Sequence, residues 1–165
     1  MKEIIRIRPY QENDFDEVFK VFNTFAKDSF AAYCNEGFDV EVFHNHIEKA
    51  KINLVLTDNN RVIGFGYISE YKPYKNFNRT GVLTYFILTE YTAKGLGTRI
   101  INELISIGKK QGITNYLAQI SSKNKQSLNF HKKHGFVEVG KFKDVGTKFD
   151  QNFDIVWMQK IFGEK

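Results

Sequence analysis

Two spacings of apolar residues alternate along this chain. Runs rich in β-branched and aromatic residues predict strands at residues 4–8, 52–57, 61–71, 83–88 and 114–120, followed by two last strands at the end of the chain. Apolar residues three and four positions apart predict a helix after Asp14, another after Asp39, a long helix from about Leu96 and a short helix at residues 124–133. This order of elements predicts a mixed sheet covered by helices on both faces.

Polar residues mark the expected helix ends and turns. Asp14, with Glu17 three residues later, has the form of a capping box, and Asp39 is placed to cap the second helix. Asp58-Asn-Asn60 predicts a hairpin turn, and Gly112 is expected to end the long helix. Residues 28–38 and 72–79 are expected to be loops. With no internal repeat or linker, residues 1–165 are predicted to form one domain.

A glycine-rich turn, Thr92-Ala-Lys-Gly-Leu-Gly-Thr98, joins a strand to the long helix. Its glycines, Gly95 and Gly97, let the backbone turn tightly and present its N–H groups, and the positive end of the helix dipole points to the same place. Lys94 adds a positive charge at the mouth of the turn. The turn therefore predicts an anion site suited to a pyrophosphate.

An isolated G-x-G turn can also be no more than a tight connection. A Walker loop requires Gly-Lys-Ser/Thr after four spacers, and the chain contains no such sequence. A dinucleotide loop requires a third glycine, but residue 100 is Ile, and the strand at residues 114–120 ends without an acidic residue. Both of these phosphate loops are excluded.

Composition narrows the class of protein further. The net charge is +5 with a pI of about 9.2, but the basic residues are dispersed and form no compact run with interleaved aromatics, so nucleic acid is not an expected partner. No apolar run reaches the length of a membrane span, and no membrane partner is expected. The single cysteine, Cys34, excludes an internal disulfide and fits a reducing compartment, so a cytoplasmic location is predicted.

Two motifs carry a resemblance to a known family. The glycine turn resembles the acyl-CoA loop of the GNAT acyltransferase superfamily, Arg/Gln-x-x-Gly-x-Gly/Ala, with Thr92 where a long polar side chain is usual. Asn124-x-x-Ser127, followed by Phe130-His131-x-x-x-Gly135-Phe136, is similar to the second signature of that family. The stretches from Glu138 to Gln159 resemble a narrower branch, the phosphinothricin and methionine-sulfoximine N-acetyltransferases and their relatives.

The resemblance implies a GNAT-like fold, with a central, mixed and mostly antiparallel sheet and a V-shaped splay between two central strands. Acetyl-CoA is the implied co-substrate, its pantetheine arm paired with the main chain of the central strand and its pyrophosphate on the glycine turn. The residues expected to contact it are Tyr85, Phe86, Ile87, Ala93, Lys94, Gly95, Leu96, Gly97, Thr98, Asn124 and Ser127.

The implied reaction is direct attack of a neutral primary amine on the acetyl thioester in a ternary complex. His131 stands where a general acid or proton relay approaches the CoA sulfur, although a packing or capping histidine fits the sequence nearly as well. His134 makes a metal pair conceivable, but no carboxylate or cysteine completes a ligand set, so no metal is expected. The general base is unknown, because Val82 stands where a glutamate is often found. Glu70 and Glu90 are alternatives at strand ends.

The acetyl acceptor implied by the branch is a small amino-acid-like amine of the phosphinothricin or methionine sulfoximine/sulfone type. Phe30 and Tyr33, beside Ala31 and Ala32, are expected to wall its pocket. Lys75 and Arg79 are expected to bind its carboxylate or phosphinate, Arg79 being preferred for its planar guanidinium. A polyamine, an aminoglycoside or a protein N-terminus remains an alternative acceptor, and a non-catalytic acyl-CoA sensor a different class. A homodimer is left open.

Overall fold

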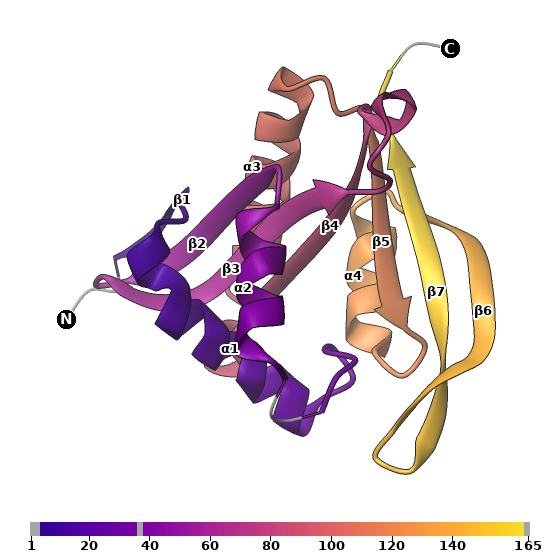
Figure 1. Ribbon diagram of the computed structural model, residues 1–165, viewed down its shortest axis with the longest axis horizontal. Coiled ribbons are helices and arrows are strands. Elements are labelled where there is room, and N and C mark those ends of the chain that lie inside the picture. The colour runs from indigo at the N-terminus through magenta and orange to yellow at the C-terminus, as the bar shows by residue number, and fades with distance from the viewer. Residues whose placement is uncertain (1–3, 36–37, 164–165) are drawn as a thin grey trace.

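The protein is described by a computed structural model that covers residues 4–35 and 38–163 (Figure 1). Within these residues, seven strands form one sheet in the order β1-β2-β3-β4-β5-β7-β6. They are β1 (Ile5–Pro9), β2 (Ile52–Asp58), β3 (Arg61–Glu70), β4 (Thr80–Ile87), β5 (Asn115–Ser121), β6 (Val137–Lys148) and β7 (Gln151–Ile161). The β4–β5 pair is parallel and the other pairs are antiparallel.

Four α-helices cover the sheet in two layers. They are α1 (Phe15–Asp28), α2 (Val40–Glu48), α3 (Leu96–Lys110) and α4 (Lys125–Lys133). Figure 1 shows α1 and α2 on one face of the sheet and α3 and α4 on the other. The predicted fold, a mixed and mostly antiparallel sheet between two layers of helices, is therefore confirmed. No helix among residues 4–35 and 38–163 has both the length and the apolar character needed to span a membrane.

The alternation of side chains along β3 and β4 builds a different core on each face. Toward α1 and α2, the rings of Phe65 and Phe86 stack with centroids 5.3 Å apart, and Phe86 meets Phe22 of α1 edge-on at 5.6 Å. Toward α3, Gly66 makes room for the helix, because a methyl group there would lie 2.9 Å from the Cδ1 atom of Ile100. The aromatic core thus lies under α1 and α2, and the aliphatic core under α3.

The two central strands pair over a short stretch only. β4 and β5 are in register at Thr80–Asn115, Gly81–Tyr116 and Val82–Leu117, after which they separate. β4 continues to Ile87 while still paired with β3, and β5 continues to Ser121 while still paired with β7. Each strand therefore keeps its outer neighbour but leaves its inner edge unpaired, which is the V-shaped splay that the family resemblance implied.

Several local predictions are confirmed. The Asp39 carboxylate accepts the backbone N–H groups of Glu41 and Val42, at 2.8 Å and 3.1 Å, and so caps α2. Asn59 and Asn60 have φ angles of 47° and 72° in the hairpin between β2 and β3. Gly112, with a φ angle of 82°, follows the end of α3.

The predicted capping box at Asp14 is wrong. The chain enters α1 through a short 3-10 turn, so Asp14 already has near-helical backbone angles and its side chain makes no cap. Its carboxylate instead accepts hydrogen bonds from the two terminal guanidinium nitrogens of Arg8, each at 2.7 Å, and from the backbone N–H group of Gln11. Glu17 accepts the N–H group of Val62 at 2.7 Å. A partner six residues away and another in the sheet replace the local contacts that the sequence suggested.

The close contact between β3 and β4 gives a test of this fold. At Gly64, a methyl group would lie 2.7 Å from the carbonyl oxygen of Phe86 and 3.2 Å from the Cα atom of Ile87, backbone atoms that cannot rotate away. We expect Gly64→Ala to lower the free energy of unfolding by about 1–3 kcal/mol, the usual range for overpacking. Urea denaturation measures this change.

Gly140→Ala in β6 is the matched control, because a methyl group at Gly140 would have no heavy atom within 4 Å. Its free energy of unfolding should stay within about 0.5 kcal/mol of that of the wild type. If the two variants were equally stable, β4 would not lie as close to β3 as described.

Candidate active site

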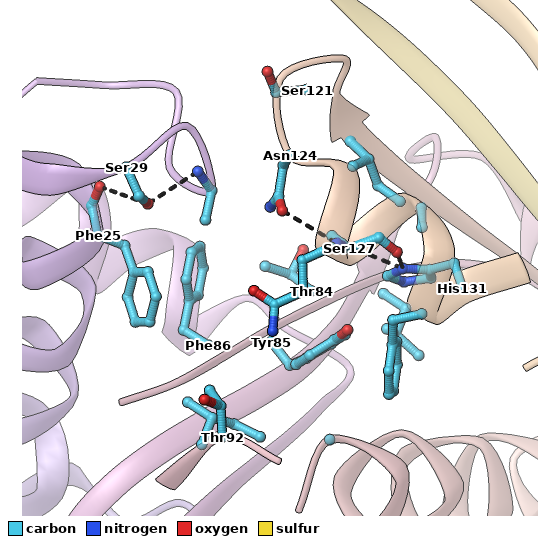
Figure 2. Close-up of a pocket in the computed structure, with 18 of the residues that line it drawn as sticks. Phe25, Ser29, Thr84, Tyr85, Phe86, Thr92, Ser121, Asn124, Ser127 and His131 are labelled. Carbon is cyan, nitrogen blue, oxygen red and sulfur yellow. Dashed lines mark hydrogen bonds between the residues drawn. The ribbon is translucent and has the colours of Figure 1, made fainter. Parts of the chain in front are cut away.

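The first cleft opens where β4 and β5 separate. It encloses about 760 Å³, and its walls come from β4, β5, α4, the turn before α3, and the end of α1 with the residues that follow it. In Figure 2, Asn124, Ser127 and His131 lie on one side of this cleft and Phe25, Ser29 and Phe86 on the other. Most of the residues expected to contact a ligand line it, namely Tyr85, Phe86, Ile87, Ala93, Gly95, Leu96, Gly97, Thr98, Asn124 and Ser127.

The glycine turn has the backbone shape that an anion site requires. Ala93 and Gly95 both have positive φ angles, 62° and 74°, which turn the chain sharply before α3. The N–H groups of the first helical residues, 96–98, have no intrahelical acceptor by position, and they carry the positive end of the helix dipole. A methyl group at Gly97 would lie 3.2 Å from the ring of Phe130, so this glycine allows α3 and α4 to pack closely.

Two side chains of this turn contact their own loop. Lys94 is not among the residues that line the cleft, and its ammonium lies 5.1 Å from the centre of the Tyr91 ring. The Thr92 hydroxyl donates to the carbonyl oxygen of Thr89 at 2.7 Å, so this side chain turns back onto its own loop. The anion site is consequently a matter of backbone more than of side chains.

Asn124 caps α4 at the opposite wall. Its side-chain oxygen accepts the N–H group of Ser127 at 3.1 Å, which leaves the amide nitrogen to donate elsewhere. Ser127 in turn contacts His131, because the Nδ1 atom of the ring lies 2.8 Å from the Ser127 carbonyl oxygen and 3.3 Å from its hydroxyl. One turn of helix thus links the cap to the histidine, as the dashed lines in Figure 2 show.

His131 is buried, with 3% of its surface exposed. A carbonyl oxygen only accepts hydrogen bonds, so the contact with Ser127 assigns the proton to Nδ1 and the lone pair to Nε2. Nε2 is buried without a hydrogen-bond partner among the described residues. Burial lowers the pKa of His131, against the opposing effect of the Ser127 carbonyl, so the ring is neutral at pH 7. A buried nitrogen left unpaired costs free energy that packing alone does not explain.

His134 has a structural part that the sequence did not reveal. Its Nδ1 atom lies 2.8 Å from the carbonyl oxygen of Phe130, so Nε2 accepts the hydroxyl of Thr98 at 2.9 Å. This contact ties α4 to the first turn of α3 across the cleft. In the sequence, His134 had drawn attention only through its i, i+3 spacing from His131, as half of a conceivable metal pair. Among the described residues, no group of three His, Cys, Asp or Glu side chains could hold a metal ion.

A second cleft, of about 1290 Å³, lies under α1 and α2. Aromatic side chains from distant elements form much of its wall, namely Tyr33, Phe38, Tyr67, Tyr71, Phe77, Phe142 and Trp157. Four residues line both clefts, Ala31, Thr84, Phe86 and Gln119. The two clefts therefore meet at the gap between β4 and β5, where molecules bound in the two clefts can touch.

The residues expected to bind the acceptor are not gathered in one place. Phe30 lines the first cleft and Tyr33 the second. Lys75 and Arg79 are exposed and line neither cleft. The charged side chains that do line the second cleft are Glu70, Lys72 and Lys141. Lys141 comes from β6, far along the chain from the loop in which sequence reasoning looked for an anchor.

The second cleft also holds the groups able to accept a proton. Val82 lines it in the place where a glutamate was looked for, and Glu70 lines it with its carboxylate 3.7 Å from the ammonium of Lys51. Glu90 is exposed and lines neither cleft. His46 of α2 lines the cleft too, its ring 5.3 Å from that of Tyr67, and burial lowers its pKa. No motif in the sequence pointed to His46.

Two known proteins are similar to this chain in sequence. L-amino acid N-acyltransferase MnaT of Escherichia coli (strain K12) is 30% identical over 112 residues, which are 68% of this chain and 65% of that protein. An L-methionine sulfoximine/L-methionine sulfone acetyltransferase of Pseudomonas paraeruginosa (strain DSM 24068 / PA7) is 30% identical over 59% of this chain and 57% of that protein. The match thus spans less than two thirds of the length of these two relatives.

Solved structures give the same fold. A ribosomal-protein-alanine N-acetyltransferase from Brucella melitensis superposes with a TM-score of 0.86 at 25% identity, over 95% of this chain and 99% of that one. A phosphinothricin acetyltransferase from Sinorhizobium meliloti, solved in complex with AcCoA, superposes with a TM-score of 0.88 at 20% identity, over 96% and 89%. The second likeness shows the fold alone.

A family profile described as an acetyltransferase (GNAT) domain matches residues 7–157. This span includes the glycine turn, α4 and both central strands, and therefore nearly all the residues that line the two clefts. The resemblance seen in the sequence, including its likeness to proteins named for methionine sulfoximine and phosphinothricin, is confirmed. The chain belongs to the GNAT acetyltransferase family.

Proposed function

We propose that this protein moves the acetyl group of acetyl-CoA to the primary amine of a small, amino-acid-like molecule. One observation carries the proposal: two clefts share wall residues and meet at the gap between β4 and β5. Direct transfer requires the thioester and the amine to be held together, with the carbonyl carbon aimed at the nitrogen. Two sites that open onto one gap meet this requirement without a covalent enzyme intermediate.

Acetyl-CoA fits the first cleft. Its pyrophosphate suits the N–H groups at the start of α3, and its amide-bearing arm suits the unpaired edge of β4 at residues 83–87. The free amide nitrogen of Asn124 is placed to donate to the same arm. Lys123 and Lys133 also line the cleft, so the local charge attracts a polyanion.

The acceptor fits the second cleft. Aromatic walls suit an apolar side chain, and both signs of charge, on Glu70, Lys72 and Lys141, suit a zwitterion. The names of the relatives, which refer to L-amino acids, methionine sulfoximine and phosphinothricin, point to the same class. The cytoplasmic location and the homodimer stay predictions.

Proton transfer follows from the state in which His131 is held. The neutral amine attacks as a nucleophile, so that a C–N bond forms while the C–S bond breaks. The nitrogen must then lose one proton, and the departing thiolate must gain one. The neutral ring carries its lone pair on Nε2, so it accepts this proton first and then returns it to the sulfur. His131 thus acts as a relay that begins as a base. His46 and Glu70, in the second cleft, are placed to deprotonate the incoming ammonium.

The acceptor class is tested by thiol release from acetyl-CoA with a panel of amines. We expect turnover with methionine sulfoximine, phosphinothricin or L-methionine, and little with spermidine, an aminoglycoside or a peptide that begins with alanine. A preference for one of the last three would place the acceptor in another class. Binding of CoA in a calorimetric titration, with no turnover on any amine, would instead show a sensor.

The relay is tested by His131→Phe, which keeps a flat ring but carries no proton. Turnover should fall by about 10²–10⁴-fold, the usual contribution of acid–base assistance, and we expect the low end because a thiolate leaves readily. The affinity for acetyl-CoA should change little. The acidic limb of the pH–rate profile should also disappear, since protonation of Nε2 blocks the relay. Steady-state kinetics across pH measures both effects.

His44→Phe is the control for this experiment, because it removes an imidazole that lines neither cleft. It should keep the turnover and the pH profile of the wild type. If His131→Phe behaved in the same way as His44→Phe, His131 would have only a packing role.

The burial of His131 also predicts its titration. Because burial lowers its pKa in the folded state, the midpoint of its NMR titration should fall below the ordinary value of about 6.5. The unfolded chain then binds more protons below that pH, so stability should decline as the pH falls from about 6.5 toward the folded pKa. This decline should be weaker in His131→Phe. A midpoint at or above the ordinary value would contradict the lowering of the His131 pKa by burial.

A further inference from the structure

A buried lysine lies outside both clefts. Lys148, the last residue of β6, has 2% of its surface exposed and lines neither cleft. Its ammonium donates to the carbonyl oxygens of Ser29 at 2.6 Å and Ala32 at 2.8 Å, and lies 5.0 Å from the centre of the Phe149 ring. Among the described residues it forms no ion pair with a carboxylate. A full positive charge is thus satisfied by two backbone carbonyls and one ring face.

Burying the ammonium in this way costs free energy, which indicates that the residue has a geometric role. Moving an ammonium out of water costs several kcal/mol, and an apolar residue of similar volume is often as good or better for stability. The burial also lowers the pKa of Lys148. Part of the cost is offset because Ser29 is the C-terminal cap of α1, where the helix dipole favours a cation. Lys148 therefore fixes the end of α1 as well as the chain beyond it.

The two carbonyls belong to the segment that separates the two clefts, residues 29–34, here called the bridging segment. Ser29, Phe30 and Ala31 line the first cleft, and residues 31–34 line the second. Within the described chain, its own internal polar contacts are a hydrogen bond from the Ala31 N–H group to the Ser29 hydroxyl and the contacts of Ser29 with Phe25. The segment is neither helix nor strand, so its shape depends on contacts from elsewhere.

Those contacts come from the β6–β7 hairpin, more than a hundred residues away. The ring of Phe30 meets Phe149 edge-on at 5.3 Å and Phe153 at 5.8 Å, and the ring of Tyr33 stacks on Phe153 at 5.9 Å. These apolar contacts hold the side chains of the segment. Lys148 is the group that holds its backbone, through carbonyls spaced three residues apart.

We propose that Lys148 is a positioning residue that fixes the bridging segment and thereby sets the shape of the acceptor cleft, without touching the acceptor. The consequence for kinetics rests on the proposed function, whereas the consequence for the segment itself does not. Loss of the ammonium should loosen the wall shared by the two clefts. The acceptor side should suffer most, because acetyl-CoA is held mainly by β4, α4 and the glycine turn.

The test is Lys148→Met, which keeps an unbranched apolar side chain and removes the charge and both hydrogen bonds. We expect the KM for the acceptor to rise roughly tenfold, because binding must then also order a segment that two charge-assisted hydrogen bonds no longer hold, and this ordering opposes binding by about the strength of one such bond. The calorimetric Kd for acetyl-CoA should change less than about twofold, a shift well under 1.4 kcal/mol. Amide hydrogen exchange of residues 29–34 should become faster at pH 7, while exchange in β2 and β3 stays unchanged.

Lys143→Met is the matched control, because Lys143 lies on the same strand, is exposed and lines neither cleft. It should leave the KM and the hydrogen exchange of the bridging segment unchanged. Lys148→Gln, which keeps a neutral donor, should give an intermediate effect and replaces the Met variant if that variant does not fold.

The outcomes separate the two proposals. Unchanged hydrogen exchange of residues 29–34 in a folded Lys148→Met variant overturns the positioning role, even if the protein acetylates amines as proposed. So does a fall in kcat with an unchanged acceptor KM, or an equal effect in Lys143→Met. Faster exchange of the segment together with no turnover on any amine, in the wild type too, leaves the positioning role standing and overturns the acetyltransferase proposal.

Discussion

The site depends on a sheet in which two neighbouring strands, β4 and β5, pair over only part of their length. Backbone N–H and C=O groups that are unpaired and shielded from water cost free energy, so a sheet normally closes such a gap. Here β4 and β5 pair at three positions and then diverge, while each remains paired on its outer edge, β4 with β3 as far as Ile87 and β5 with β7 as far as Ser121. The outer pairs keep both strands extended, and the inner edge of β4 stays available to a ligand.

Packed side chains from α4 lie against β4 where β4 and β5 have separated. The rings of Phe130 and His131 from α4 lie 5.6 Å and 5.8 Å from that of Tyr85 on β4. Where the strands still meet, the hydroxyl of Tyr116 lies 3.1 Å and 3.0 Å from the carbonyl oxygens of Ile105 and Ile113, which fixes the start of β5 against the end of α3. His131 thus helps to hold the gap open while its unpaired Nε2 supplies the proposed relay.

The sequence was informative wherever function depends on neighbours along the chain. The glycine turn and the Asn124 cap follow from short motifs, because turns, caps and helix starts are local, whereas the splay was implied by the family resemblance alone. The sequence failed where partners are distant. Asp14 pairs with Arg8 instead of capping α1, and Lys75 and Arg79 line neither cleft, although Lys72 and Phe77 of the same loop line the second one. Lys148, which sequence reasoning would leave in water, is buried by a loop more than a hundred residues away.

The two halves of the site therefore rest on different physics. The first cleft, proposed for acetyl-CoA, offers mainly backbone groups of the glycine turn and of β4, which short segments specify. The second cleft, proposed for the acceptor, has walls from α1, α2, β3, β4, β5, β6 and β7, and its shape is set by how these elements pack. A wall assembled from so many elements needs contacts that hold these elements in place. The buried ammonium of Lys148, with its two carbonyl partners, is one such contact. Under the proposed function, acceptor choice is thus a property of tertiary packing, which is why the motifs that identify the family say so little about the amine.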